Sequence, residues 1–240
     1  MKLSIIIPAY NEAKTIAEVI AKINEQNYPG WDKEIVVVDD GSSDNSKVKI
    51  ENSKSQLKIQ NLKLIIHDEN RGKGAAIKTG LAAATGDAVI VQDADLEYDP
   101  ADIQNLLSAL DGRTDVVIYG SRNLKPERRG YSHYVLGSKI LDWLVNIFFG
   151  TRLTDVYTCY KLFPVSVIKK INPVRNGVSN GAGIQSRGFE LEMELTVKTL
   201  KMGYKIIEVP IHYYPRKFSE GKKIRTKDGF KGIWTLLKYR

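Results

Sequence analysis

Acidic side chains follow three apolar runs in the first half of the sequence, at points where strands are expected to end. The three segments are Pro8-Ala9-Tyr10-Asn11-Glu12, Asp39-Asp40-Gly41-Ser42-Ser43-Asp44 and Asp93-Ala94-Asp95-Leu96-Glu97. Ligands of open parallel sheets bind outside the carboxyl ends of the strands, so these side chains are candidates for one shared site. A single Asp at a strand end is at least as often a turn or helix-cap residue, and Asp44 and Asp99 fit that role.

The closely spaced carboxylates of Asp93, Asp95 and Glu97 favour a metal site. Alternate side chains of an extended segment share a face, so we expect all three to point to one place. Hard oxygen ligands suit Mg²⁺ or Mn²⁺, and both ions also accept the oxygens of substrate phosphates. Without a cation these carboxylates would repel one another. The sequence therefore predicts a divalent-cation site for a phosphorylated substrate.

Gly72-Lys73-Gly74 is a second candidate for phosphate binding. It is not a dinucleotide fingerprint, since Ile77 stands in place of the third glycine, and it is not a Walker A loop, since Gly74 follows the lysine. Two interpretations stay open: a turn into the alanine-rich stretch that follows, or a lysine that contacts a phosphate. The histidines are far apart and the single cysteine, Cys159, lies among apolar and aromatic residues, so neither type indicates a catalytic centre.

Charge is divided unevenly along the chain. Residues 1–120 contain 13 Lys and Arg against 19 Asp and Glu, whereas residues 121–240 contain 23 against 9. A basic half indicates an anionic partner, which is a phosphate, a nucleic acid or an acidic membrane surface. No nucleic-acid-binding module pattern is present in the sequence, and the acidic strand ends would repel a polyphosphate, so we expect no nucleic-acid partner.

Strand-like and helix-like segments alternate through the first half. Short runs rich in Val and Ile are typical of buried strands, and they are Leu3–Ile7, Glu34–Val38, Lys63–Ile66, Ala88–Val91 and Val116–Tyr119. Helical patterns lie between them: apolar residues at i, i+3, i+4 and i+7 from Ile16 to Ile23, an alanine-rich stretch at 74–84, and a helix that Pro100 opens. This alternation predicts an α/β fold with a mostly parallel central sheet and helices on both faces.

The second half is less regular. We expect a basic loop at 122–133, an apolar helix at 134–149, a loop rich in Gly and Ser at 175–188, a helix at about 189–202, a strand at Lys205–Ile211 and a basic tail. The 134–149 helix either packs on the core or lies on a membrane between arginines that bind lipid phosphates. No uncharged stretch approaches the length of a membrane span and no signal peptide is recognisable. The single cysteine fits a cytoplasmic protein, and we interpret residues 1–240 as one domain.

Taken in order, these segments resemble the family-two inverting glycosyltransferases of the GT-A fold. The resemblance rests on Ile5–Glu12, Val37–Ser42, Asn70–Gly74 and Asp93–Asp95. Later motifs are similar to the branch of polyprenyl-phosphate sugar synthases, which includes dolichyl-phosphate mannose and glucose synthases. Those motifs are Gly120–Arg122, Thr154–Lys161, Gly188–Glu192 and Pro210–Arg216.

The resemblance implies roles for the matching residues. Residues 1–120 would bind the nucleotide sugar and the metal, and residues 121–240 would bind the acceptor and close a basic C-terminal lid over the donor. The nucleotide would contact Pro8, Tyr10, Glu12, Val37, Asp39, Lys73, Asp93, Ala94, Arg216 and Lys222. Mg²⁺ or Mn²⁺ would bind Asp93, Asp95 and Glu97, and the acceptor phosphate would bind Arg122, Arg129 and Ser138. The catalytic residues would be Asp95, Asp155, Glu190 and Arg122.

The implied function is metal-dependent transfer of a sugar, with inversion, from a nucleoside-diphosphate sugar to a polyprenyl or dolichyl phosphate. The donor would be of the GDP-mannose or UDP-glucose type. A phosphate acceptor is already ionised at neutral pH, so this reaction needs no strong base. In the alternative, the acceptor is a hydroxyl in cell-surface polysaccharide or glycan synthesis, and Asp155 or Glu190 would be the base. A lipid acceptor predicts a peripheral protein at the cytoplasmic face of the membrane.

Overall fold

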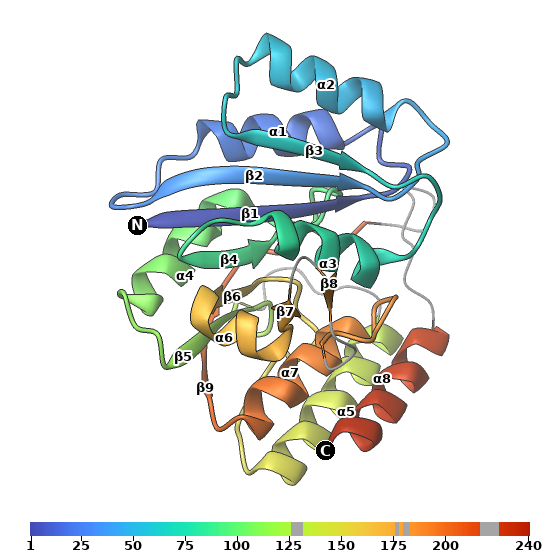
Figure 1. Ribbon diagram of the computed structural model, residues 1–240. Coiled ribbons are helices and arrows are strands. Elements are labelled where there is room, and N and C mark those ends of the chain that lie inside the picture. The colour runs from blue at the N-terminus through green and yellow to red at the C-terminus, as the bar shows by residue number, and fades with distance from the viewer. Residues whose placement is uncertain (126–131, 176–177, 180–182, 217–225) are drawn as a thin grey trace.

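The computed structural model describes residues 1–125, 132–175, 178–179, 183–216 and 226–240. Its main sheet has seven strands in the order β3-β2-β1-β4-β6-β5-β9 (Figure 1). The strands are β1 (Lys2–Ala9), β2 (Asp32–Asp39), β3 (Leu62–Ile66), β4 (Ala88–Val91), β5 (Val116–Ser121), β6 (Lys161–Pro164) and β9 (Lys205–Pro210). Neighbouring strands are parallel except at β6, which is antiparallel to both β4 and β5. The mostly parallel α/β sheet predicted from the sequence is confirmed.

Helices cover both faces of this sheet. In Figure 1, α3 lies in front of the sheet, whereas α1 and α4 lie behind it. The first half contains α1 (Ile16–Glu25), α2 (Ser46–Gln56), α3 (Lys73–Ala83), the 3-10 turn η1 (Pro100–Asp102) and α4 (Ile103–Leu110). The second half contains α5 (Ser132–Phe149), α6 (Val165–Ile171), the short strands β7 (Val174–Arg175) and β8 (Val178–Ser179), α7 (Leu191–Lys201) and α8 (Thr226–Tyr239).

The main core lies on both sides of the central strands. Ile5, Ile6 and Ile7 of β1 are consecutive and all fully buried, because helices cover the sheet on each face. The apolar face predicted for α1 is buried as expected, from Ile16 to Ile23. This packing fixes where β1, β2 and β4 end, and therefore where the polar side chains after them begin.

Three elements differ from the predictions made from the sequence. Helix α2 has no apolar stripe, and Ile50 is its one large buried apolar side chain. Strand β6 begins with a charged residue, Lys161, which interrupts the apolar pattern. Helix α8 lies within the stretch interpreted as a basic tail. Contacts made by the folded protein, rather than local periodicity, stabilise α2 and β6. Helix α8 does have a helical apolar pattern, at Phe230, Ile233, Trp234 and Leu237, which the interpretation as a basic tail missed.

A second apolar cluster joins α5, α7 and α8. It contains Leu141, Val145, Leu153, Val156, Met193, Val197 and Leu236. Leu141 and Val145 of α5 are therefore core residues. Other large apolar side chains of α5 and α8, two helices that lie side by side (Figure 1), are exposed. We call them the α5–α8 apolar surface: Leu136, Ile140, Trp143, Ile147, Phe148, Phe230, Trp234 and Leu237. Among the described residues, no helix combines the length and hydropathy that a membrane span requires.

Candidate active site

The carboxyl ends of β1, β2 and β4 lie at one edge of the sheet, because these strands are parallel neighbours. At the end of β2, Asp39 is buried and accepts a hydrogen bond from the backbone N–H of Ser42 at 3.0 Å. The next residue, Asp40, accepts the N–H groups of Arg71 and Gly72 at 3.0 and 2.8 Å. Asp40 therefore holds the loop before α3, and Asp39 turns the chain at the predicted edge.

The Gly-Lys-Gly segment forms a turn that requires glycine, and its lysine forms an ion pair with Asp93. Gly72 has a φ of +94°, and a Cβ there would lie 2.4 Å from the carbonyl oxygen of Arg187. The Nζ of Lys73 lies 2.8 Å from Asp93 Oδ1 and 3.5 Å from Glu192 Oε1. Burial is the largest single influence and raises the pKa of Asp93, but the charge and hydrogen bond of Lys73, the hydrogen bond of Cys159 and the charge of Arg216 together lower that pKa. Lys73 is thus the counter-ion of the first carboxylate after β4.

The three carboxylates after β4 do not form a ready-made group of three metal ligands among the described residues, and their shared role as ligands stays a prediction. Leu96 has a φ of +63°, so the segment turns instead of running extended, and side chains no longer alternate across a plane. Asp93 faces Lys73, whereas Asp95 and Glu97 face Arg216. Within the described ranges, no three His, Cys, Asp or Glu side chains are arranged to hold a metal.

Arg216 lies at the centre of this acidic group. Its Nη2 donates to Asp95 Oδ2 at 2.8 Å, its Nη1 donates to Glu12 Oε2 at 3.3 Å, and its backbone N–H donates to Glu97 at 2.8 Å. The hydroxyl of Tyr213 also donates to Glu97, at 2.8 Å. In the part of the chain that the structure describes, the buried Nε of Arg216 has no hydrogen-bond partner. One guanidinium therefore faces three carboxylates.

Negative charge at Asp95 is only partly compensated. Burial, followed by the charges of Asp93 and Glu97, raises the pKa of Asp95 to about 7, although Arg216 acts in the opposite direction. A divalent cation would relieve this repulsion, and the all-oxygen donors of Asp93 and Asp95 fit Mg²⁺ or Mn²⁺. The residues therefore fit the predicted ion, provided that further oxygen ligands come from a bound substrate.

The acceptor candidate Arg122 is fixed by Asp155. The Nε and Nη2 of Arg122 donate to the two carboxylate oxygens, each at 2.7 Å, and its backbone N–H donates to Oδ2 at 2.9 Å. Such a bidentate pair sets the plane of the guanidinium. The guanidinium carbon lies 5.0 Å from the centre of the Tyr213 ring, within cation–π range. The side chain of Tyr213 thus lies between Arg122 and the acidic group around Arg216.

The two candidate bases differ in their surroundings. Asp155 is 0% exposed and both of its oxygens bind Arg122, so it orients that guanidinium, and its role as a base for a hydroxyl acceptor stays a prediction. Glu190 precedes α7, and its Oε1 accepts the N–H groups of Arg187 and Gly188. Its Oε2 is buried and, among the described residues, lacks a hydrogen-bond partner. Glu190 is therefore held through one oxygen, and its role as a base for a hydroxyl acceptor stays a prediction.

The other residues predicted to contact the nucleotide lie either at the carboxyl ends of the strands or inside a strand. Pro8 and the exposed Tyr10 lie at the end of β1, beside the edge. Ala94 is buried, and its carbonyl oxygen accepts a hydrogen bond from the hydroxyl of Thr15 at 2.6 Å. Val37 is fully buried inside β2, so its side chain belongs to the core and does not face the edge.

The remaining predicted acceptor and lid residues are described only in part. Ser138 lies on α5 and is half-buried. Arg129, Lys222 and most of the segment predicted to form a lid lie outside the described residues. Of that segment, Arg216 is described, and it contacts the acidic group rather than extending into solvent.

A buried ion pair beside the site is missed by the sequence patterns. Lys161 Nζ lies 2.7 Å from Glu192 Oε2 and also donates to the carbonyl oxygens of Val156 and Thr158. Glu192 in turn faces Lys73, so these charges form a chain from α3 to β6. The available signal was a lysine inside the otherwise apolar run Tyr160-Lys161-Leu162-Phe163, since a buried lysine requires partners.

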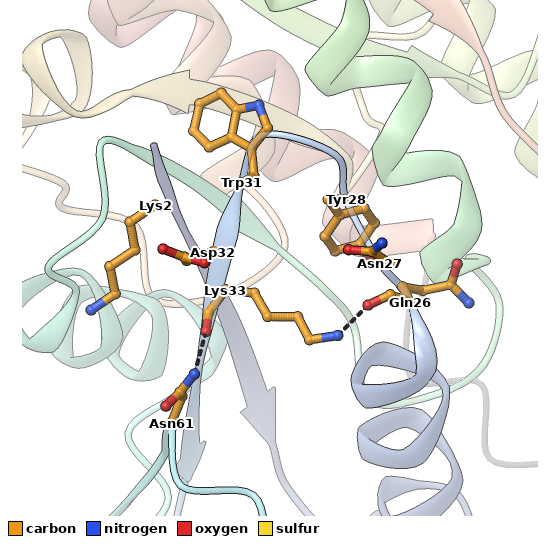
Figure 2. Close-up of a pocket in the computed structure, with 8 residues that line it drawn as sticks. All are labelled: Lys2, Gln26, Asn27, Tyr28, Trp31, Asp32, Lys33 and Asn61. Atoms are coloured by element: carbon orange, nitrogen blue, oxygen red, sulfur yellow. Dashed lines mark hydrogen bonds between the residues drawn. The ribbon is translucent and has the colours of Figure 1, made fainter.

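A separate surface pocket lies at the opposite end of the strands, near the starts of β1 and β2 (Figure 2). Its Lys33 donates to the carbonyl oxygens of Ile23, Asn24 and Gln26, which end α1. The side chains drawn in Figure 2 include no acidic cluster comparable to that around Arg216. This pocket is therefore not the candidate active site.

The sheet order and the helices on both of its faces match the GT-A fold. Solved structures of glucosyl-3-phosphoglycerate synthase from Mycobacterium tuberculosis share the fold. The complex with UDP has a TM-score of 0.70 and 18% identity, covering 99% of this chain and 79% of the other. The complex with Mn²⁺, UDP and phosphoglyceric acid has a TM-score of 0.72 and 19% identity, covering 99% and 78%.

The chain belongs to glycosyl transferase family 2, whose sequence model matches residues 4–171. It is 31% identical to the dolichol-phosphate mannosyltransferase of Pyrococcus furiosus over 249 aligned residues. That alignment covers all of this chain and 64% of the relative. The chain thus spans about two thirds of the length of that relative.

Proposed function

We propose that this chain transfers a sugar from a nucleoside-diphosphate sugar to a polyprenyl or dolichyl phosphate, with inversion and with a requirement for Mg²⁺ or Mn²⁺. The observation that carries the proposal is the position of Tyr213 between two arginines, Arg122 paired with Asp155 and Arg216 within its acidic group. Its hydroxyl binds Glu97 in the group around Arg216, and its ring contacts Arg122. A donor diphosphate and an acceptor phosphate would therefore bind on either side of one aromatic ring.

The reaction joins the acceptor phosphate to the anomeric carbon of the donor sugar. A phosphate oxygen attacks that carbon, the bond to the donor diphosphate breaks, and the diphosphate leaves with the electron pair. Arg122 would bind the acceptor phosphate through the guanidinium N–H groups that Asp155 does not use. Arg216 would exchange a carboxylate for the leaving diphosphate. No proton has to be removed from an ionised phosphate, which agrees with the engagement of both Asp155 oxygens.

Asp93 and Asp95 would hold the divalent cation. When bound, the ion supplies positive charge that stabilises the leaving diphosphate. Because the described carboxylates do not form a complete ligand set by themselves, we infer that cation and nucleotide bind together. The solved glucosyl-3-phosphoglycerate synthase that holds Mn²⁺ and UDP in one complex supports this inference.

The lipid acceptor is supported by the α5–α8 apolar surface and by the mannosyltransferase relative. Trp143, Trp234 and Phe230 are 60%, 64% and 71% exposed, and lysines such as Lys139 and Lys238 lie on the same helices. Aromatic side chains beside cations are typical of proteins that bind at anionic lipid surfaces. We therefore propose a peripheral position at the cytoplasmic face of the membrane.

A hydroxyl acceptor is the second candidate. The observation that favours it is the buried Glu190 Oε2, which lacks a hydrogen-bond partner among the described residues and could accept a hydroxyl proton. Under this alternative, Glu190→Gln would abolish transfer. Under the main proposal, Glu190→Gln would leave measurable transfer to a lipid phosphate.

The test is a donor and acceptor screen. Purified protein is incubated with Mn²⁺ and radiolabelled GDP-mannose or UDP-glucose. The acceptors are a short polyprenyl phosphate, the matching polyprenol and a soluble sugar. Product is extracted into organic solvent, and NMR determines its anomeric configuration. We expect an inverted, lipid-phosphate-linked sugar that forms with one donor and is lost in excess EDTA.

Two results would contradict the proposal. Transfer to the polyprenol or the soluble sugar but not to the polyprenyl phosphate would establish the hydroxyl alternative. Undiminished transfer in excess EDTA would remove the metal requirement. Arg122→Lys is a suitable companion variant because it keeps the charge but loses the bidentate contact with Asp155, so we expect transfer to fall while nucleotide binding persists.

A further inference from the structure

The turn at residues 153–156 is held from one side by α5. Asn146 accepts the backbone N–H of Leu153 at 2.8 Å and donates to the carbonyl oxygen of Leu153 at 2.9 Å. One helical turn earlier, Asp142 accepts the backbone N–H of Val156 at 2.8 Å. Two side chains at i and i+4 on α5 therefore bind both ends of this turn.

The opposite side of the turn is held by β9. The carboxylate of Glu208 accepts the backbone N–H groups of Thr154 and Asp155 at 2.8 and 2.9 Å. Polar side chains of α5 and β9 thus bind the backbone of each residue from 153 to 156. The side chain that this clamped turn presents is Asp155, which orients the guanidinium of Arg122.

We propose that Asp142 and Asn146 are positioning residues, which fix the turn at 153–156 and through Asp155 set the place of Arg122. They touch no reacting atom in this scheme. Their effect on transfer rests on the proposed function, in which Arg122 binds the acceptor phosphate. Their effect on the geometry of Arg122 does not depend on which acceptor the enzyme uses.

The chemistry of Asp142 agrees with a hydrogen-bonding role. Burial, and then the nearby charge of Asp155, raises the pKa of Asp142 to about 8, while the hydrogen bond from Val156 and the charge of Arg122 act against this. The group is therefore mostly neutral at pH 7, and an amide can replace it with little loss. Asp142→Asn should keep the bond to Val156, whereas Asp142→Ala removes it.

The geometric test uses NMR of protein labelled with ¹⁵N-arginine. The Nε–H of Arg122 is bound to Asp155, so its signal should exchange slowly with water, and its loss in Arg122→Lys assigns it. In Asn146→Ala and Asp142→Ala we expect exchange to be about 10-fold faster or more. Asp142→Asn should stay within about twofold of the wild type, as should the matched control Asn172→Ala, which removes a buried side-chain bond to Ile184 N–H.

The kinetic test measures donor and acceptor constants separately. We expect Asn146→Ala to raise the acceptor KM by about 10-fold or more, with the donor KM within about twofold. In an Arg122→Lys background, adding Asn146→Ala should cost little further, because both changes act on one group. If Asn146→Ala fails to fold, Asn146→Asp takes its place, since it keeps the acceptor bond and loses the donated one.

The outcomes separate the inference from the proposed function. Unchanged Arg122 exchange in folded Asn146→Ala and Asp142→Ala overturns the positioning role. If the effects of Asn146→Ala and Arg122→Lys on the acceptor KM multiply in the double variant, the positioning role is also overturned. Faster exchange with a normal acceptor KM supports the positioning role and contradicts phosphate binding by Arg122. Faster exchange with a raised acceptor KM supports both.

Discussion

Replacing Asp95 by Asn should stabilise the ligand-free protein and remove its joint response to metal and nucleotide. The side chain is 16% exposed, and burial with Asp93 and Glu97 nearby raises its pKa from 3.8 to about 7. The unfolded chain releases this proton near pH 4, whereas the folded chain keeps it until about pH 7. Folded-state stability therefore falls as the pH rises through this window, and the neutral amide avoids that loss.

The size of the effect follows from the pKa. The change from 3.8 to about 7 is equivalent to about 4 kcal/mol. Solvent screening and the lost contact with Arg216 reduce the expected gain to about 2 kcal/mol. For a chain of this length, that raises the melting temperature by about 4–8 °C. The gain should be absent below pH 4, grow up to pH 7 and stay constant above it.

The assay is thermal unfolding of wild type and variant from pH 4 to pH 8, with and without Mn²⁺ plus UDP or GDP. Asp93→Asn is the matched control, because Lys73 lowers the pKa of Asp93 and the same substitution should destabilise the protein. If Asp95→Asn melts at or below the wild-type temperature at pH 8, the charge argument is refuted. If it keeps a metal-dependent nucleotide shift, Asp95 is not a ligand of the cation.

Three further outcomes are expected. Arg216→Ala should weaken binding of the metal–nucleotide pair by about 10-fold or more in calorimetry, since it removes a charge from the diphosphate site; unchanged affinity would contradict this role. Trp234→Glu and Phe230→Glu should reduce sedimentation with anionic liposomes while the melting temperature stays within about 2 °C, and added salt should weaken wild-type binding. Lys161→Ala should cost about 3–5 kcal/mol in denaturant unfolding because it leaves Glu192 buried with less compensation, and Lys161→Met with Glu192→Leu should recover most of it.

The sheet and its acidic edge were predictable from the sequence because short-range patterns determine them. The apolar spacing from Ile16 to Ile23 predicts the buried face of α1, and the run Ala88–Val91 matches β4 residue for residue. The position of Asp39 and Asp93 after such runs predicts that they share an edge. Each of these inferences requires only the geometry of a strand or a helix.

The contacts within the site were not predictable in the same way. Arg216 pairs with Asp95 and Glu12, which are distant in sequence, and no periodicity relates them. The left-handed φ of Leu96 changes the direction of the two side chains that flank it. Similarly, the bidentate contact between Arg122 and Asp155 depends on the end of β5 meeting the 153–156 turn. Such contacts follow from tertiary packing rather than from local sequence.

The antiparallel strand β6 imposes an order on synthesis of this protein. β4 is made early, but one of its edges pairs with β6 only after Phe163 and Pro164 have emerged from the ribosome. Until then the nascent sheet exposes unpaired backbone groups beside Val89, which are a template for association with another chain. A fragment that ends at residue 120 would keep that edge open permanently. A chimera that exchanges C-terminal segments between relatives should therefore be joined after Pro164, so that the first four strands retain the strand that pairs with β4.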